Sequence, residues 1–171
     1  MMVWKLNFNQ KGENGKMIKI LFVCHGNICR SVAAEYIFKA IVKEKNKESL
    51  FQISSRATTT EEEGNDIYPP MKKALTRQHI SFFSHHAKQI TQKDYDEYDY
   101  IFLMDTYNTR TIRYVIPQDD QHKIMLLSDF VHASKEVDDP WYTGLFDEVV
   151  LQLKDYCLKC FTCILKESEK I

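Results

Sequence analysis

Residues 18–31 read Ile-Lys-Ile-Leu-Phe-Val-Cys-His-Gly-Asn-Ile-Cys-Arg-Ser and carry the strongest structural signal in the chain. The run 18–23 is apolar, rich in β-branched residues and of strand length. Residues 31–45 then place apolar side chains at helical spacing, with Lys and Glu on the opposite face. Residues 24–30 form a short loop between these two segments. The stretch therefore predicts a strand, a tight loop and a helix in direct succession.

The same alternation continues towards the C-terminus. Further strands are predicted at 51–55, 100–104 and 123–127, further helices at 71–78, 108–114 and 146–165, and loops at 58–66 and 131–143. Short apolar strands that alternate with helices indicate parallel strands joined by right-handed crossovers. The expected fold is α/β: a small doubly wound, parallel four-stranded sheet with helices on both faces, of the flavodoxin-like kind. Such sheets bind ligands beyond the carboxyl ends of their strands, where the loop after residue 23 lies.

Composition indicates one ordinary globular domain. The chain has 171 residues, a formal net charge of −1, 44% hydrophobic residues and 27% charged residues. This balance supplies no basic surface for nucleic acid or for a membrane, and no apolar run reaches the ~20 residues that span a bilayer. We expect residues 17–171 to form the domain and the polar residues 1–16 to be a loose N-terminal extension. A short extra strand at 3–8 is the alternative for that extension.

Cysteine usage favours a reducing compartment. The chain has no signal-peptide pattern and an odd number of cysteines, namely Cys24, Cys29, Cys157, Cys160 and Cys163. This combination favours a cytoplasmic protein with free thiols. The last three are spaced three residues apart on a predicted helix, where they form a drifting stripe that favours packing over zinc binding. We expect no metal and no cofactor.

The loop at 24–30 suits a phosphate group. Gly26 and Asn27 tolerate the positive φ angles that a tightly curled loop requires. Backbone N–H groups of the loop and of the following helix N-terminus can converge on an anion, and Arg30 can fork onto two of its oxygens. The same field stabilises a thiolate at Cys24, and a thiolate is the nucleophilic form. Ser31 can cap the helix or direct its hydroxyl at the Cys24 sulfur.

These residues resemble a known family. The segment Val-Cys-His-Gly-Asn-Ile-Cys-Arg-Ser at 23–31, followed by Ala34-Glu35, resembles the active-site signature of the low molecular weight protein tyrosine phosphatases. Further matching blocks, in the family's order, are Ser-Arg-Ala-Thr at 55–58, Ser-His-His-Ala-Lys-Gln-Ile at 84–90, Met104-Asp105 with Asn108, and Asp-Asp-Pro-Trp-Tyr at 138–142. The resemblance covers nearly all of residues 17–166. It implies a cysteine-dependent phosphomonoester hydrolase, most directly a protein tyrosine phosphatase.

The resemblance also implies a role for individual residues. Cys24 is the expected nucleophile, Arg30 the cation that binds phosphate and the transition state, and Asp139 the general acid directly before a proline. The expected phosphate-binding residues are His25, Gly26, Asn27, Ile28, Cys29 and Arg30. The expected supporting hydrogen-bond network consists of Asn27, Ser31, Ser55 and His85. In this family the second loop cysteine, here Cys29, can form a reversible disulfide with the nucleophile.

The expected reaction has two steps and needs no metal, because the loop supplies the positive field. Cys24 attacks phosphorus while Asp139 protonates the leaving phenolic oxygen, and the ionised Asp139 then activates water to hydrolyse the cysteinyl-phosphate. Asp139 must carry a proton in the first step. We therefore expect an acid-shifted optimum with small aryl phosphates, with Asp138 as the fallback acid.

The walls of the pocket are expected to include Trp141 and Tyr142, which could stack on a phenyl ring or only pack the loop onto the domain. The family often carries an aromatic residue in the loop after the second strand. This chain has Thr-Thr-Glu-Glu-Glu at 59–63 instead, with Glu61 as the best match. These acids should repel acidic phosphopeptides. Val32 replaces a common proline, and Asp105 is expected to be a structural partner of the site.

The expected partner is a phosphotyrosine protein or a small aryl phosphate, and the expected oligomeric state is a monomer or a weak dimer. Two other functions use the same loop. An arsenate reductase of this fold would need resolving cysteines on a mobile segment, and residues 74–105 contain none. A non-catalytic phosphate-binding or redox-sensing module would bind phosphate without turnover. Nothing in the sequence favours lost activity, since Cys24, Arg30 and Asp139 are all present.

Overall fold

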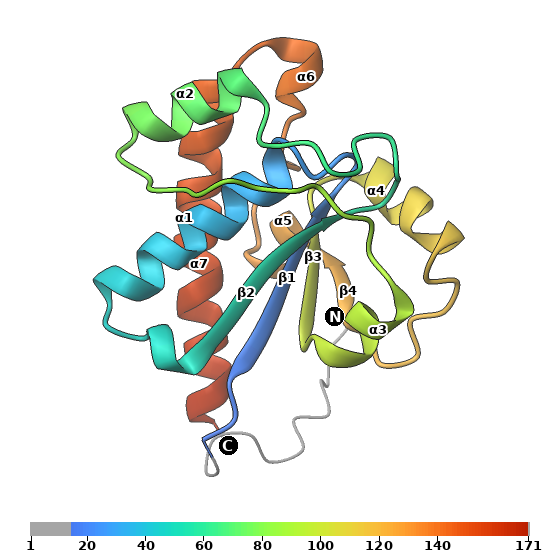
Figure 1. Cartoon of the computed structure of the whole chain (residues 1–171). Helices are drawn as coiled ribbons and strands as arrows, with labels where there is room; N and C mark the ends of the chain where they lie inside the picture. The colour runs from blue at the N-terminus through green and yellow to red at the C-terminus, as the bar shows by residue number, and fades with distance from the viewer. Residues whose placement is uncertain (1–14, 171) are drawn as a thin grey trace.

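The computed structural model describes residues 15–170. Its four strands form one parallel sheet in the order β2-β1-β3-β4 (Figure 1). The strands are β1 Ile18–Cys24, β2 Phe51–Ala57, β3 Tyr100–Leu103 and β4 Ile124–Leu126. This order is the doubly wound arrangement of flavodoxin-like folds, so the predicted fold class is confirmed.

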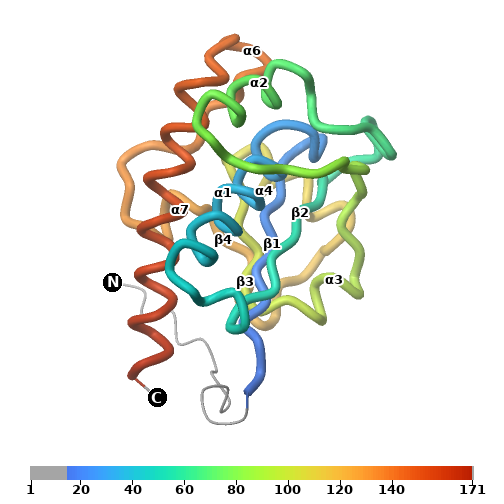
Figure 2. Tube along the Cα trace, turned by 60° about the vertical axis from the view of Figure 1, so that its left-hand side comes forward, coloured from blue at the N-terminus to red at the C-terminus, as the bar shows by residue number. Residues whose placement is uncertain are grey.

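Helices cover both faces of the sheet (Figures 1 and 2). They are α1 Arg30–Glu44, α2 Pro69–Arg77, α3 Gln92–Glu97, α4 Thr106–Thr111, α5 Leu127–Phe130, α6 Pro140–Thr143 and α7 Phe146–Glu169. One-turn 3₁₀ helices lie at Glu48–Leu50 and Ile112–Tyr114. Helices α1, α2 and α7 pack together on one face, and α3 and α4 lie on the other (Figure 1). None of the helices within residues 15–170 is long and apolar enough to cross a membrane.

Two hydrophobic clusters hold the layers together, because successive side chains of a strand point to opposite faces. On the α1 and α7 side, the fully buried Phe22 contacts Phe38 and Phe102 with ring centroids 5.8 and 5.9 Å apart. On the α3 and α4 side, Leu21 and Leu103 belong to the smaller cluster. Strand β1 therefore lies between two buried hydrophobic clusters, which hold its carboxyl end in place.

Several predicted boundaries change. The predicted loop at 131–143 is wrong at its end, where Pro140–Thr143 form α6 behind an Asp139 cap. Helix α3 was not predicted, although Thr91 and Asp94 make the capping box that begins it. The last strand is shorter than predicted because Leu127 already begins α5. The predicted extension at 1–16 and the alternative strand at 3–8 lie outside the described residues, apart from Gly15 and Lys16, which have no regular secondary structure.

The topology brings three separate segments to one edge of the sheet. Strand β1 lies between β2 and β3, with Val23 paired to both Arg56 and Leu103. The loop after β1 and the start of α4 after β3 therefore adjoin each other. The segment between α5 and α6 returns over the same edge, where Val137 N donates to the carbonyl of Met104. This edge is the switch point at which doubly wound sheets bind ligands.

Candidate active site

The loop between β1 and α1 curls around residues 24–30. Asn27 has φ 61°, in the left-handed region that asparagine tolerates, so the predicted positive φ is found there. Gly26 does not share this conformation, and the prediction for its backbone is wrong. Gly26 instead provides room, because a Cβ at this position would lie 3.1 Å from Glu62 Cγ. A glycine therefore lets the loop after β2 approach the curl.

Cys24 is the last residue of β1 and is buried. Its Sγ lies 3.1 Å from Ser31 Oγ and 3.4 Å from the backbone N of Ser31. No side chain caps α1, whose N-cap residue is Cys29, so of the two alternatives for Ser31 the contact with sulfur is the one observed. Two donors of the first helical turn thus face the sulfur and can stabilise a thiolate.

A buried hydrogen-bond chain fixes the direction of the Ser31 hydroxyl. Asn27 Nδ2 donates to Ser31 Oγ and to Ser55 Oγ, each at 2.9 Å, which uses both amide hydrogens. Ser31 Oγ accepts from Asn27 and, while Cys24 is a thiol, from the Cys24 sulfur; its own hydrogen is available to a Cys24 thiolate. Of the predicted supporting residues, Asn27, Ser31 and Ser55 lie together beneath the loop.

Glu35 completes this chain, and the sequence reasoning assigned it no role. Its Oε1 accepts from Ser55 Oγ at 2.6 Å, its Oε2 pairs with Lys39, and the residue is buried on α1. The carboxylate orients the Ser55 hydroxyl, which leaves the Ser55 oxygen to accept from Asn27. The signal in the sequence was a glutamate on the apolar face of a helix, four residues before a lysine.

His85 supports the loop from the other side. Its Nε2 lies 2.7 Å from the carbonyl oxygen of Asn27, and its backbone N donates to Asp66 Oδ1 at 3.0 Å. Burial lowers the pKa of His85, and the Asn27 carbonyl opposes this effect. The neutral ring with hydrogen on Nε2 fits the geometry. His86 is exposed, so the two adjacent histidines lie in different environments.

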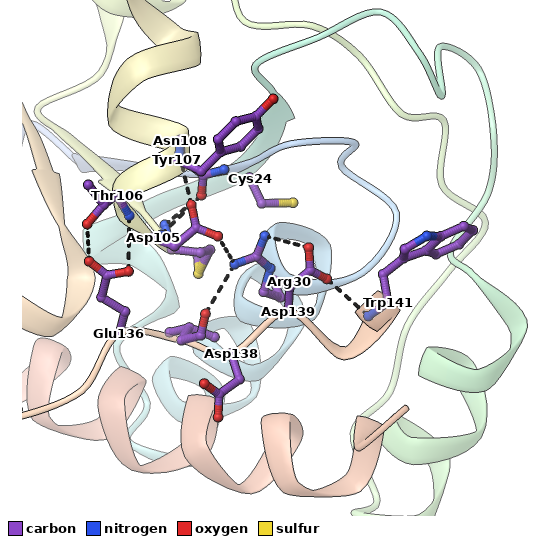
Figure 3. A network of polar contacts seen from close by, with 12 residues as sticks. Cys24, Arg30, Asp105, Thr106, Tyr107, Asn108, Glu136, Asp138, Asp139 and Trp141 are labelled. Atoms are coloured by element: carbon purple, nitrogen blue, oxygen red, sulfur yellow. Dashed lines mark hydrogen bonds and ion pairs between the residues drawn. The ribbon is translucent and has the colours of Figure 1, made fainter. Parts of the chain in front are cut away.

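Arg30 is buried at the start of α1 and reaches across to two carboxylates (Figure 3). Its Nη1 lies 2.5 Å from Asp105 Oδ2 and donates to the carbonyl of Val137 at 3.1 Å, and its Nη2 lies 3.2 Å from Asp139 Oδ2. Burial alone would lower the pKa of Arg30, but the negative charges of Cys24 and the two aspartates outweigh it and raise the pKa. The guanidinium is a permanent, positioned positive charge.

Asp105 has a second function in the structure. It caps α4, accepting from Asn108 N at 2.8 Å, and Asn108 Oδ1 in turn accepts from the backbone N of Asp105 at 3.2 Å. Glu136 binds both the backbone N and the hydroxyl of Thr106 (Figure 3). The expected structural role of Asp105 thus has a geometric basis, since one residue joins the arginine to the helix start.

Asp139 and Asp138 point in different directions (Figure 3). Asp139 caps α6, with Oδ1 accepting from Trp141 N at 3.0 Å, and its Oδ2 faces Arg30. Asp138 pairs with Lys135 at 2.5 Å, away from Arg30. Only Asp139 of this pair lines the pocket. The geometry therefore disfavours Asp138 as the fallback acid.

A pocket of about 630 Å³ opens above the loop. Of the predicted residues, it is lined by Cys24, His25, Gly26, Ile28, Cys29, Arg30, Glu61, Asp105, Asp139, Trp141 and Tyr142, whereas Asn27 is not among the lining residues. No signal in the sequence indicated Tyr107, which follows the cap of α4 and lines the same pocket, as does Glu62, one of the acids expected to repel acidic phosphopeptides. Tyr107 and Trp141 flank Cys24 and Arg30 (Figure 3). A slot between aromatic side chains can hold a phenyl ring.

All five cysteines are free. Cys29 lines the pocket, and burial, followed by the nearby charge of Cys24, raises the pKa of its thiol far above the ordinary value. Cys157 and Cys160 are residues of α7 and are completely buried, and this burial raises the pKa of each. Within residues 15–170, no group of three or more His, Cys, Asp or Glu side chains is placed to hold a metal ion.

Fold and pocket together define a class: an α/β protein whose strand–loop–helix junction presents a cysteine and an arginine to one pocket. The family model described as "Low molecular weight phosphotyrosine protein phosphatase" matches residues 19–170. The chain belongs to this family, and its activity is that of a low molecular weight protein-tyrosine-phosphatase.

Individual members of the family are similar to this chain over most of its length. The low molecular weight protein-tyrosine-phosphatase YfkJ of Bacillus subtilis is 36% identical over 155 residues, which cover 90% of this chain and 99% of that protein. A low molecular weight phosphotyrosine protein phosphatase of Schizosaccharomyces pombe is 38% identical over 82% of this chain and 93% of its own. The crystal structure of YfkJ superposes with a TM-score of 0.85, covering 90% of this chain and 98% of that one.

Proposed function

We propose that the protein hydrolyses phosphotyrosine and small aryl phosphates through a cysteinyl-phosphate, with Cys24 as nucleophile, Arg30 as phosphate-binding cation and Asp139 as general acid. One observation carries this proposal. A sulfur, a guanidinium and a carboxylate from residues 24, 30 and 139 line a single pocket, and the arginine contacts the aspartate directly. Nucleophile, electrostatic clamp and proton donor are the three groups that phosphate ester cleavage requires.

In the first step the phosphoryl group lies on the backbone N–H groups of residues 25–30 and on Arg30. Cys24 Sγ attacks phosphorus in line, and the P–O bond to the phenol breaks as Asp139 delivers a proton to that oxygen. In the second step ionised Asp139 takes a proton from water, the water oxygen attacks phosphorus, the P–S bond breaks and phosphate leaves. Ser31 donates a hydrogen bond to Cys24 whenever the sulfur is a thiolate.

The test is hydrolysis of p-nitrophenyl phosphate from acidic to neutral pH without added metal. We expect turnover by the wild type and a loss of about 10⁴-fold or more in Cys24→Ser, since removing a nucleophile removes the covalent route. Cys163→Ser is the matched control, because Cys163 lies on α7 and does not line the pocket. An inactive, fully reduced wild type, or an active Cys24→Ser, would refute the proposal.

We further propose that oxidation switches the activity off reversibly. Cys24 and Cys29 line the same pocket. Peroxide would oxidise the Cys24 thiolate to a sulfenic acid with release of hydroxide, and the Cys29 thiol would displace water from it to form a disulfide. We expect peroxide-inactivated protein to have two fewer free thiols, those of Cys24 and Cys29. We expect it to regain activity when a dithiol is added. Absence of an intramolecular disulfide together with no recovery would refute this switch.

We also infer a cytoplasmic location and a monomer or weak dimer. Five free cysteines, one of which must stay a thiolate, suit a reducing compartment. Every group assigned to the reaction comes from one chain, so activity requires no second copy. Light scattering across a concentration series, with kcat measured at each concentration, tests the oligomeric state. A kcat that rises with dimer content would contradict it.

A further inference from the structure

The outer rim of the pocket carries negative charge from the loop after β2. Glu61 and Glu62, which we call the acidic rim, both line the pocket. The Glu61 side chain is 67% exposed, and its Oε2 lies 2.7 Å from His25 Nε2. The stem of Glu62 lies over Gly26, and its Oε2 accepts from Asn65 Nδ2 at 2.6 Å. Each carboxylate therefore has a hydrogen-bond partner that holds it in a defined position.

The charged groups deeper in the pocket already pair with one another. The basic residues of its lining are His25 and Arg30, and Arg30 binds Asp105 and Asp139. A bound phosphate dianion adds further negative charge on the same guanidinium. The acidic rim lies outside this set, and its basic neighbour in the lining is His25. The His25 ring contacts the rim through Nε2, whereas its Nδ1 is buried with no hydrogen-bond partner.

The acidic rim lies at the mouth of the pocket. The His25 ring contacts the Tyr107 ring, with centroids 5.8 Å apart, so Glu61, His25 and Tyr107 form one side of the mouth. Trp141 lies on the other side of Cys24 and Arg30 (Figure 3). A phosphotyrosine ring between these aromatics places its neighbouring residues over the mouth. A carboxylate has lone pairs for several donors, so Glu61 can bind a cation while it accepts from His25.

We propose that the preferred substrates are phosphotyrosine segments with lysine or arginine next to the phosphotyrosine, and that Glu61 determines this specificity with support from Glu62. This inference rests on the proposed function and names the substrate class of the same site. Acidic neighbours would be repelled by two carboxylates, whereas a basic neighbour gains a salt bridge on leaving bulk solvent. The preference is electrostatic and should weaken with salt, because the rim is exposed.

The test compares three phosphotyrosine peptides that differ only in Lys, Gln or Glu on both sides of the phosphotyrosine, at neutral pH and low salt. We expect kcat/KM to fall in the order Lys, Gln, Glu, with about a threefold to tenfold span, as exposed charge pairs allow. Glu61→Gln should narrow the span and Glu61→Lys should abolish or reverse it. Glu97→Lys makes the same charge change at the end of α3, just before the start of β3 and so at the end of the sheet opposite the pocket, and should keep the wild-type order.

The results separate this inference from the proposed function. Turnover of p-nitrophenyl phosphate by the wild type establishes the reaction whatever the peptides show. Equal rates on the three peptides, a preference for the Glu peptide, or an unchanged order in Glu61→Lys would each overturn the specificity while leaving the reaction standing. A span in the wild type that survives 1 M salt would also overturn it.

Discussion

Arg30 Nη2 lies 3.2 Å from Asp139 Oδ2, although 109 residues separate the two in sequence. The contact fixes where the proposed acid meets the proposed phosphate site. Phosphate oxygens and the Asp139 carboxylate would use the same guanidinium, so the aspartate must share or release Arg30 when substrate binds. Release next to a phosphate dianion favours the protonated carboxyl, which is the form that can act as a general acid.

Asp139→Asn should lower kcat for p-nitrophenyl phosphate by about 10²- to 10⁴-fold, the usual contribution of a general acid. Asparagine still caps a helix well, so α6 should keep its start. The loss should be larger for phenyl phosphate, whose leaving group needs the proton more. Asp138→Asn is the matched control and should retain near-wild-type kcat, because Asp138 pairs with Lys135. Equal losses in the two variants would contradict Asp139 as the acid.

Asp105→Asn should separate the anchoring of Arg30 from the capping of α4. The amide keeps an oxygen for Asn108 N but removes the charge opposite Arg30 Nη1. We expect kcat/KM to fall by about tenfold, mainly in kcat, because a displaced guanidinium binds the transition state less well. Stability should fall by about 1 kcal/mol in urea unfolding. Asp120→Asn, exposed in the turn before β4, should change neither quantity.

Asn27→Ala should damage both backbone and network. The variant loses the hydrogen bonds to Ser31 and Ser55. It also places an alanine at φ 61°, in the left-handed region that asparagine tolerates better. We expect a loss of about 2–3 kcal/mol in the free energy of unfolding and a lower kcat. Asn46→Ala provides the control for strain alone, since exposed Asn46 has φ 53° outside the site. It should cost about 1 kcal/mol and leave kcat unchanged. Equal kcat values in both variants would contradict a role for the network.

His85 should make the fold sensitive to acid. Its pKa in the folded protein is lowered from 6.5, so between the folded and unfolded values the unfolded chain binds more protons. The contribution of His85 to stability is complete above about pH 6.5 and is lost as pH falls through the lower, folded pKa. The thermal unfolding midpoint of the wild type should therefore fall more steeply with decreasing pH than that of His85→Gln. The glutamine can still donate to the Asn27 carbonyl. Parallel pH profiles for the two proteins would refute this.

Much of the fold was predictable because its signals are local. The apolar run that becomes β1 and the helical periodicity that becomes α1 depend on residues close in sequence, and burial on both faces leaves few other structures for such strands. The short elements were harder to predict. Helices α3 and α6 have four to six residues, and each depends on a cap, Thr91 or Asp139, more than on any apolar pattern.

The residues of the site likewise fall into a group that local sequence predicts and a group that only the tertiary structure brings together. The loop with Cys24, Asn27 and Arg30 is continuous in sequence, so its residue types alone indicate an anion-binding curl with a nucleophile. The partners of Arg30 come from distant segments, since Asp105 follows β3 and Asp139 precedes α6, and their convergence depends on the strand order. The choice between Asp138 and Asp139 likewise depends on which side chain faces Arg30.

Local chemistry thus predicted the strands, the loop and the proposed nucleophile, because each follows from residues within about one turn or one strand of each other. Long-range packing established the rest. The direction of the Ser31 hydroxyl depends on Ser55 and Glu35, and the wall of the pocket depends on Tyr107 meeting His25. Hydrogen bonds and ring contacts act over a few ångströms, so only a chain folded into its β2-β1-β3-β4 sheet brings these groups within reach.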